Sequence, residues 1–337
     1  MSIKKLPGTV FYVSLLAFTL FVVYVLYINQ EVFYTAHERS EFLYGAPFFD
    51  RLMEKPFGLI QYAGAWLTLL FYHPALGTGV LAAIWVLIFF VGAKAFRLKG
   101  SATALMLLPI ACLLVSVVDL GYWIYVSTIR GYWFSQSLGY LIMLLLLWAA
   151  SRTPRKWHLA WYLCGFCLYP VLGWFSMLFL LCLILISKPS WRELIGIVIL
   201  IFTAAIWHVL LYSNQKFDDV VLAGLPRFAT PSDQTDHLSY TFWVLGALSA
   251  VLPLCGRYLC RWFVPALCAA ASIIYTSSLM YYDQNYIDEM RMVRYAEADN
   301  WQEVLQMAEK NKQPTNTMVF LKNIALMNEG GLLDRSF

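Results

Sequence analysis

Residues 29–74 decide how this chain is organised, and they read NQEVFYTAHERSEFLYGAPFFDRLMEKPFGLIQYAGAWLTLLFYHP. The stretch directly follows the first apolar segment. It concentrates charged side chains in a sequence that has few elsewhere, and these are Glu31, His37, Glu38, Arg39, Glu41, Asp50, Arg51, Glu54 and Lys55. We therefore expect any reactive site to lie in or beside this stretch.

The whole chain has the composition of a membrane protein. Of its 337 residues 61% are hydrophobic and 13% are charged, against about a quarter charged in an ordinary soluble domain. Several apolar runs approach or exceed the roughly 18–20 residues that a helix needs to cross a bilayer. The net charge of +4 does not suggest nucleic-acid binding, because the basic residues fall at the ends of apolar segments. The predicted fold class is all-α, a polytopic helical membrane bundle.

The apolar runs predict about nine spans, two of them short. The run at 8–28 follows a basic start but has no small-residue cleavage site, so we interpret it as a retained span rather than a signal peptide. Residues 158–187 are interrupted at Tyr169–Trp174, where Pro170 and Gly173 weaken a helix, and we predict a hairpin of two short helices there. The other spans are predicted near 76–93, 102–118, 132–150, 194–212, 239–255 and 262–280.

Charge at the span ends predicts the orientation. Lys and Arg collect on the cytoplasmic side of membrane proteins. With the hairpin in place, twelve Lys and Arg residues before residue 281 fall on one side and six on the other, while ten of the eleven acids take the side with fewer cations. This predicts a bacterial inner-membrane protein with a cytoplasmic N-terminus, an outer loop at 29–75 and an extracytoplasmic C-terminal tail.

The composition changes at Tyr281, which divides the chain into a transmembrane bundle at 1–280 and a soluble helical segment at 281–337. Apolar residues recur there at helical spacing, with a break at Asp299 and Asn300 and a stop at Gly330. The A-x-x-D-N-W-x-x-V-L-x-x-A pattern resembles the start of a tetratricopeptide-like array. Such arrays need about three repeats, so we expect this one to be incomplete.

The opening loop itself has the periodicity of helices that lie along a membrane surface. Apolar positions from Phe48 to Leu70 follow an i, i+3, i+4 pattern, and Trp66 and Tyr72 suit headgroup depth. An acid held at such a surface has a raised carboxyl pKa and can act as a general base. The alternative is an extramembrane helix pair that caps the bundle.

Three groups of side chains are candidates for chemistry. Glu38 and Glu41 belong to the densest polar cluster near a span end, together with His37 and Arg39. His37 and Glu41 are spaced i, i+4, which allows a divalent metal if the piece is helical, although the spacing is common by chance and no cofactor is predicted. Asp119 ends the third span, where an ionisable group is either functional or a simple interfacial stop.

Basic and sulfur-containing side chains supply the remaining candidates. Arg130 and Arg227, in predicted outer loops, would hold a lipid phosphate, or they are ordinary solvated charges. Cys164 and Cys167 form a C-x-x-C inside an apolar run without a second pair, and we interpret them as packing residues. The sequence contains no Walker A, G-x-G-x-x-G, G-x-S-x-G or H-E-x-x-H pattern.

Two resemblances follow from these features. The chain resembles an uncharacterised bacterial membrane family with a tetratricopeptide-like tail. Five blocks carry this resemblance: HERSEF, YGAPFF, KPFGLIQYAGAWLTLLFYHPALG, NWQEVLQMAEK and NIALMNEGGLLDRSF. The architecture resembles the C-type membrane glycosyltransferases, which carry a catalytic acid in the first outer loop. That likeness gives the acid's position to Glu38, or else to Glu31 or Glu41, with Asp119 as a second-loop acid. The early acids here are all glutamates, whereas that group's first-loop signatures contain aspartate.

The leading hypothesis is therefore a glycosyltransferase-like enzyme that uses a polyprenyl-phosphate-linked sugar on the outer face of the membrane. In it Glu38 deprotonates the acceptor hydroxyl, arginines hold the lipid phosphate, and the tail binds the acceptor. The alternative is a non-enzymatic scaffold whose tail recruits a periplasmic protein. A transporter fits less well, because few ionisable residues lie at the middle of the spans and no inverted repeat is evident.

Overall fold

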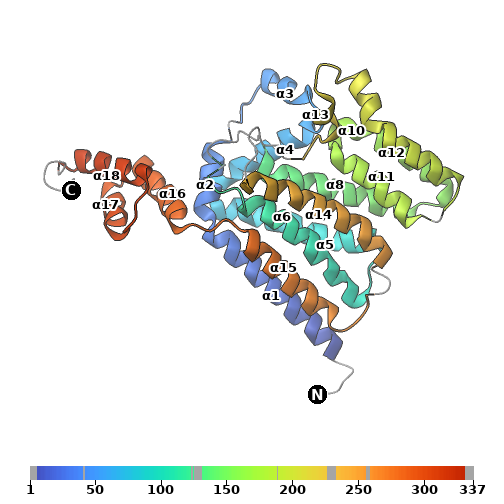
Figure 1. The fold of residues 1–337 in the computed structure, drawn as a ribbon, viewed down its shortest axis with the longest axis horizontal. Helices are drawn as coiled ribbons and strands as arrows, with labels where there is room; N and C mark the ends of the chain where they lie inside the picture. Colours follow the sequence, from blue (N-terminus) through green and yellow to red (C-terminus); the bar gives the residue numbers. More distant parts are fainter. Residues whose placement is uncertain are drawn as a thin grey trace.

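The computed structural model describes residues 6–40, 42–122, 124, 131–187, 189–225, 233–255 and 259–330. Every regular element in these ranges is a helix, which confirms the predicted all-α class. Figure 1 shows a bundle of long helices from which the C-terminal helices project to one side. The long helices of the bundle are α1 (Leu6–Ile28), α5 (Pro74–Ala95), α6 (Leu107–Val118), α8 (Tyr132–Arg152), α12 (Trp191–Leu210), α14 (Asp233–Cys255) and α15 (Val264–Leu279).

Five helical segments of the described residues are long and apolar enough to cross a membrane: Gly8–Ile28, Pro74–Ala95, Gly100–Val118, Tyr132–Arg152 and Trp191–Leu210. A sixth is added if α15 and α16 (Gln284–Glu297), which are bent by 72°, count as one span. The chain is thus a multi-helix membrane protein, with fewer full-length candidates than the nine spans predicted. The short α9 (His158–Cys167) and α11 (Trp174–Ile186) explain part of the difference. At about 1.5 Å per residue they reach roughly 15 and 20 Å, short of a hydrocarbon core of about 30 Å.

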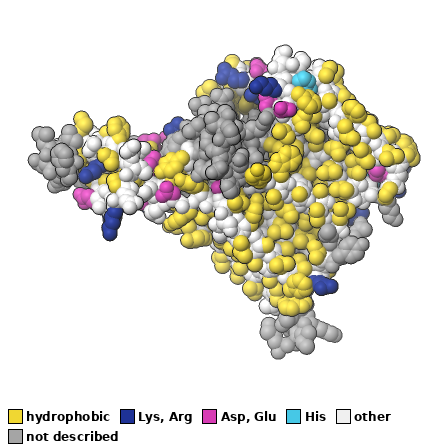
Figure 2. All heavy atoms as spheres, viewed as in Figure 1, with side chains coloured by type: hydrophobic (Ala, Val, Ile, Leu, Met, Phe, Trp, Pro, Cys, Tyr) yellow, Lys and Arg dark blue, Asp and Glu magenta, His cyan; other side chains and the backbone are white. Residues whose placement is uncertain are grey.

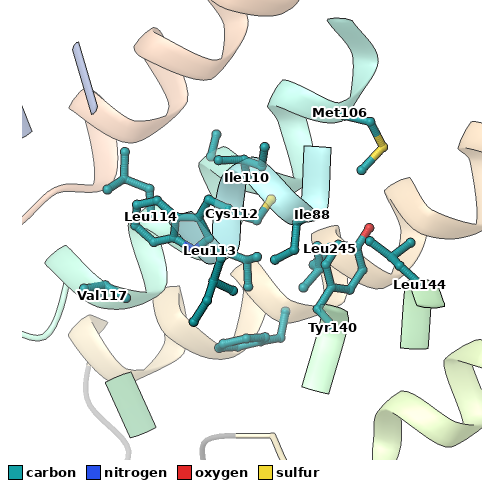
Figure 3. Close-up of a cluster of buried hydrophobic side chains, with 14 of the residues drawn as sticks. Ile88, Met106, Ile110, Cys112, Leu113, Leu114, Val117, Tyr140, Leu144 and Leu245 are labelled. Carbon is teal, nitrogen blue, oxygen red and sulfur yellow. The ribbon is translucent and has the colours of Figure 1, made fainter. Parts of the chain in front are cut away.

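The centre of the bundle is α6, preceded by η3 (Gly100–Met106). Of the twelve residues of α6, only Leu108 is not buried. Its side chains meet those of α5, α8 and α14, and Figure 3 shows Ile88, Leu113, Tyr140 and Leu245 converging on this core. A helix that is apolar all round must be surrounded by other helices, so α6 organises the bundle.

The outer surface of the bundle is apolar, as a lipid-facing surface requires. Large side chains of α1, α5 and α12 are exposed, among them Tyr12, Leu16, Val86, Phe90 and Ile201. Figure 2 shows hydrophobic side chains spread widely over the bundle, with most of the visible charged side chains on the tail and along the upper edge. In water such a surface would be unfavourable, so it fits the membrane assignment.

Residues 158–187 fold back on themselves. Ser187 Oγ lies 3.2 Å from Nδ1 of His158, which brings the two ends of the segment together. The chain reverses at α10 (Tyr169–Leu172) and Gly173, whose φ of 53° suits glycine. A Cβ at Gly173 would also stand 2.3 Å from the carbonyl oxygen of Ala223. The predicted hairpin is therefore present, and its turn packs tightly against the loop after α13 (Phe217–Val221).

The opening loop is helical and lies against the same turn. It contains α2 (Gln30–Glu38), α3 (Ala46–Met53), α4 (Gly58–Thr68) and η2 (Leu69–Tyr72). Phe57 enters the bundle between α3 and α4 with a positive φ of 73°, and its side chain is fully buried. Its N–H donates to the carbonyl oxygen of Pro170 at 2.8 Å, and its ring lies 5.9 Å from that of Phe175. Phe57 thus joins the opening loop to the hairpin.

The tail begins with α16, which packs against α2, and continues with α17 (Trp301–Lys310) and α18 (Asn316–Asn328). These three helices share a small core of Met292, Val304, Met318, Leu321 and Ala325. Thr315 caps α18 by accepting a hydrogen bond from the Met318 N–H at 3.3 Å. The helix break expected at Asp299 and Asn300 falls between α16 and α17, and α18 ends two residues before Gly330.

Replacing Phe57 with alanine should loosen the whole opening loop. The substitution removes a fully buried ring and keeps an unfavourable positive φ, so we expect a loss of about 3–5 kcal/mol in the free energy of unfolding. Thermal unfolding of the purified protein in detergent measures it. Phe49→Ala is the control, because Phe49 belongs to the same loop and is 36% exposed. Equal melting temperatures for the two variants would contradict this role.

Candidate functional site

The described charged side chains of the bundle lie toward its two ends, with carboxylates beside Arg39, Arg51 and Lys55 at one end and mainly cations at the other. We call the end that carries Glu31, Glu38, Asp50, Glu54 and Asp119 the acidic end. Two contacts between distant segments hold it together: the Tyr286 hydroxyl donates to the Gly121 carbonyl oxygen at 2.9 Å, and Asn29 Nδ2 lies 3.9 Å from the Met280 sulfur. The opposite end, which we call the basic end, carries Lys94, Arg97, Lys99, Arg152 and Arg155. There the Arg97 guanidinium donates to the Ser151 carbonyl oxygen at 2.7 Å.

Helix α2 presents the polar cluster that the sequence singles out. Its apolar face is anchored by Phe33, which is fully buried with its ring 4.9 Å from that of Phe71. Because this face points into the bundle, Glu38 and Arg39 at the end of the helix are exposed and His37 is half-buried. The Nδ1 atom of His37 is buried and has no hydrogen-bond partner among the described residues.

A groove of about 300 Å³ lies between the opening loop and the tail. We call it the tail groove, and it is lined by Tyr34, Tyr72, His73, Arg294, Glu297 and Ala298. The Glu38 carboxyl lies close enough to Glu297 to interact with it electrostatically. Partial burial raises the pKa of Glu297, and the nearby Glu38 carboxylate raises it further. The ring of His37 stands 5.5 Å from that of Tyr72, so both His37 and Glu38 adjoin this groove.

The tail is held in place by an ion cluster on α2. Glu31 is only 6% exposed. Its carboxylate lies 3.1 Å from Nη1 of Arg294 and 3.8 Å from Nε of Arg291. The Arg294 guanidinium also stands over the Tyr34 ring at 4.8 Å. Glu31 therefore fixes α16 rather than standing open to a substrate.

The sequence reasoning missed the partners of these acids on α16. Arg291, Arg294 and Glu297 are spaced by three residues, which places them on one face of a helix. That spacing is a readable signal of a shared face. The spacing does not predict which helix this face contacts, because α2 lies some 260 residues away in the chain.

Asp119 lies at the end of α6 and is 6% exposed. Its Oδ2 atom is buried and has no hydrogen-bond partner among the described residues. Burial raises the pKa of the Asp119 carboxyl to about 7. The carboxyl interacts electrostatically with the hydroxyl of Tyr132, which donates to the Ser116 carbonyl oxygen at 2.6 Å.

A narrow pocket opens beside these residues. We call it the inner pocket, and its lining residues are Ala36, Arg39, Ser40, Thr68, Leu120, Ile124, Gly131, Tyr132 and Trp133. It offers about 30 Å³ to water, enough for one or two water-sized groups. Arg39 thus lines a pocket whose wall includes Leu120, the neighbour of Asp119, whereas Glu38 does not line it. The structure does not bring Glu38 and Asp119 into one pocket.

Several predicted site residues cannot be placed. Glu41, Arg130 and Arg227 lie outside the described residues. Within the described part of the chain, no three His, Cys, Asp or Glu side chains form a group that could hold a metal ion. The His37–Glu41 metal hypothesis depends on Glu41 and stays a prediction. Cys164 and Cys167 are free thiols, half-buried and exposed respectively.

The fold and the apolar surface fit an all-helical membrane protein with several long apolar helices, whose charged residues lie toward the two ends of the bundle. The chain belongs to DUF6057, a family of unknown function, whose sequence profile matches residues 4–337. This confirms the expected membership of an uncharacterised family. No curated protein and no solved structure matches the chain.

Replacing Glu31 with glutamine should release α16 from α2. The substitution removes the buried negative charge that binds two arginines, and a hydrogen bond to a charged group is worth about 1.5–3 kcal/mol. We expect faster amide hydrogen exchange in α16, measured by mass spectrometry in detergent, with little change in α6. Asp288→Asn is the matched control, because Asp288 also faces Arg291, at 3.8 Å, but belongs to α16 itself. If amide hydrogen exchange in α16 is unchanged in the Glu31 variant, Glu31 does not hold α16 against α2.

Proposed function

We propose that the protein is a glycosyltransferase-like membrane enzyme that takes a sugar from a polyprenyl-phosphate carrier at the acidic end of the bundle. The observation that carries the proposal is the buried Asp119 carboxyl, whose Oδ2 has no partner among the described residues. A general base works best when its pKa is near the working pH, and burial raises the pKa of Asp119 to about 7. Asp119 therefore suits the role of base better than the exposed Glu38.

The proposed step balances as a substitution at the anomeric carbon. The acceptor hydroxyl gives its proton to Asp119, and its oxygen forms a new bond to C1 of the sugar while the bond from C1 to the phosphate oxygen breaks. The leaving polyprenyl phosphate keeps the electron pair. Arg39, which lines the inner pocket, is the described cation nearest to this role, and Arg130 and Arg227 remain candidates for the same phosphate.

The tail groove is the proposed site for a part of the acceptor that is remote from the reacting hydroxyl, because this groove and the inner pocket beside Asp119 are separate. Tyr34, Tyr72 and His73 offer ring faces that can cover the C–H face of a sugar, and Glu297 and Glu38 offer carboxylates that accept hydrogen bonds from hydroxyls. In this arrangement Glu38 binds the acceptor instead of deprotonating it. The tail, which contributes Arg294 and Glu297, takes part in binding rather than serving only as an attachment.

We also propose the full topology of nine spans, with the acidic end and the tail outside the bacterial inner membrane. The short helices α9 and α11 then count as two incomplete spans. The gathering of Lys94, Arg97, Arg152 and Arg155 at the basic end supports a cytoplasmic position for that end.

A scaffold that recruits a periplasmic partner is the second candidate. Its support is the outer face of α18, where Val319, Phe320 and Met327 are 43%, 64% and 65% exposed. Exposed apolar side chains of this size on a soluble helix are typical of contact surfaces. In this alternative α16, α17 and α18 form the beginning of a helical-repeat array, and the acidic end has no chemical role.

Replacing Asp119 with asparagine should lower sugar transfer by roughly 10²–10⁴-fold, the usual contribution of a general base. Transfer is measured as release of polyprenyl phosphate from a panel of polyprenyl-phosphate monosaccharides by purified protein. In the native enzyme the rate should fall as the pH drops below about 7, because a protonated carboxyl cannot accept the proton. Asp119→Glu should keep part of the activity with a shifted pH profile.

Asp50→Asn is the matched control, since Asp50 is an exposed acid of the opening loop at the same end. It should keep native activity. If Asp119→Asn, Glu38→Gln and Glu297→Gln all transfer sugar at the native rate, the catalytic proposal is wrong. If no donor in the panel reacts with the native protein while the tail captures a periplasmic protein through Phe320, the scaffold is favoured.

The orientation is tested separately with single cysteines in a background without native cysteines. Lys312→Cys, on the exposed turn between α17 and α18, should react with a membrane-impermeant maleimide in intact cells. Lys99→Cys, at the basic end, should react only after the cells are broken. The opposite pattern would reverse the proposed topology without affecting the fold.

A further inference from the structure

Three cations meet at the basic end where α5 and α8 finish. The Lys94 ammonium stands 5.3 Å from the centre of the Trp148 ring, and the Arg152 guanidinium stands 4.5 Å from it. Arg97 joins them through its bond to the Ser151 carbonyl oxygen. Two helices thus direct positive charge to the surroundings of a single indole ring.

Acidic side chains that could balance this charge are scarce. Between Glu54 and Glu193 the chain has one acid, Asp119, and it lies at the acidic end. Glu193 is already engaged, with its carboxylate 3.4 Å from Arg155 and 3.5 Å from His158. Among the described residues, no carboxylate forms an ion pair with Lys94, Arg97 or Arg152. Ser151 lies in the last turn of α8, where a carbonyl group suits a cation such as Arg97. Among the described residues, Lys94 and Arg152 contact the Trp148 ring and no carboxylate.

An apolar groove continues from this cluster. We call it the tryptophan groove, and it is lined by Thr153, Pro154, Trp157, Ala160, Trp161 and Cys164. Its volume is about 380 Å³. The Trp161 indole N–H donates to the Thr153 hydroxyl at 2.8 Å, which fixes the loop that directly follows Arg152 against α9. The positive cluster and the apolar groove are therefore adjacent, since Thr153 in the groove directly follows Arg152 in the cluster.

We propose that this surface binds an anionic phospholipid, with the phosphate held by Lys94 and Arg152 at the edge of the Trp148 ring and one acyl chain in the tryptophan groove. A lipid fits better than a soluble anion because α5 and α8, whose ends form the cluster, are candidate membrane spans. Trp157 is 54% exposed, and tryptophan at a span end marks the membrane interface. Basic clusters at such positions recognise anionic headgroups. The site is separate from the proposed catalytic end and does not depend on it.

Native mass spectrometry of the full-length protein with dioleoyl phosphatidylglycerol or dioleoyl phosphatidylcholine tests the proposal. The native protein should retain the anionic lipid preferentially. The double variant Lys94→Gln and Arg152→Gln should bind it roughly 25-fold more weakly, about fivefold for each cation lost. A matched double variant in the tail, Lys310→Gln and Lys312→Gln, removes the same charge elsewhere and should bind like the native protein.

A third variant tests the contribution of the acyl chain to binding separately from that of the headgroup. Cys164→Trp fills the tryptophan groove without changing any charge, and it should also weaken retention of the anionic lipid. Excess glycerol 3-phosphate, which has the headgroup charge and no acyl chain, should fail to displace the lipid. Equal retention of the two lipids by the native protein, or of the anionic lipid by all variants, would overturn the site. Displacement by glycerol 3-phosphate would show a soluble-anion site and contradict the lipid assignment.

Discussion

Phe57 is the contact on which the arrangement of the acidic end depends. Its ring is fully buried and its backbone has a positive φ, so the loop between α3 and α4 must enter the bundle at this one point. Cβ atoms added at Gly139, Gly173 or Gly224 would lie 3.0–3.2 Å from the Phe57 side chain. Three segments that are distant in the chain therefore close around one side chain. The opening loop is fixed to the bundle as a result, and α2 is set in a defined position.

The position of α2 determines what each acid near it can do. Glu31 faces inward and binds Arg291 and Arg294 of the tail. Glu38, two turns later on the same helix, faces the tail groove and meets Glu297. Asp119 is buried beside Tyr132, and its Oδ2 has no hydrogen-bond partner among the described residues. Three carboxyl groups at one end of the molecule thus have three different environments, because burial and partners set what a carboxyl can do more than its type does.

The two ends of the bundle differ in charge and in the kind of ligand they suit. The acidic end combines carboxylates, aromatic rings and two pockets, which is a suitable setting for a sugar or another polyhydroxy compound. The basic end combines Lys94, Arg97 and Arg152, which form no ion pair with a carboxylate among the described residues, with tryptophan and an apolar groove, and this combination suits a lipid with a phosphate. Both ends are built by the termini of the same apolar helices, so one bundle positions both surfaces.

Hydropathy and helix-breaking residues alone predict where most helices and turns lie, because these features depend only on residues that are close in the sequence. The apolar runs locate the long helices, Pro170 and Gly173 locate the hairpin turn, and the periodicity of residues 48–70 locates α3 and α4. The same local signals place Asp119 at the end of the third apolar run, but they do not predict that residues 30–38 form helix α2. They cannot predict that Glu31 meets Arg294, that Glu38 meets Glu297, or that Asp119 is buried away from Glu38. Those relations arise only when segments up to 260 residues apart pack together, and that packing is decided by the tertiary structure.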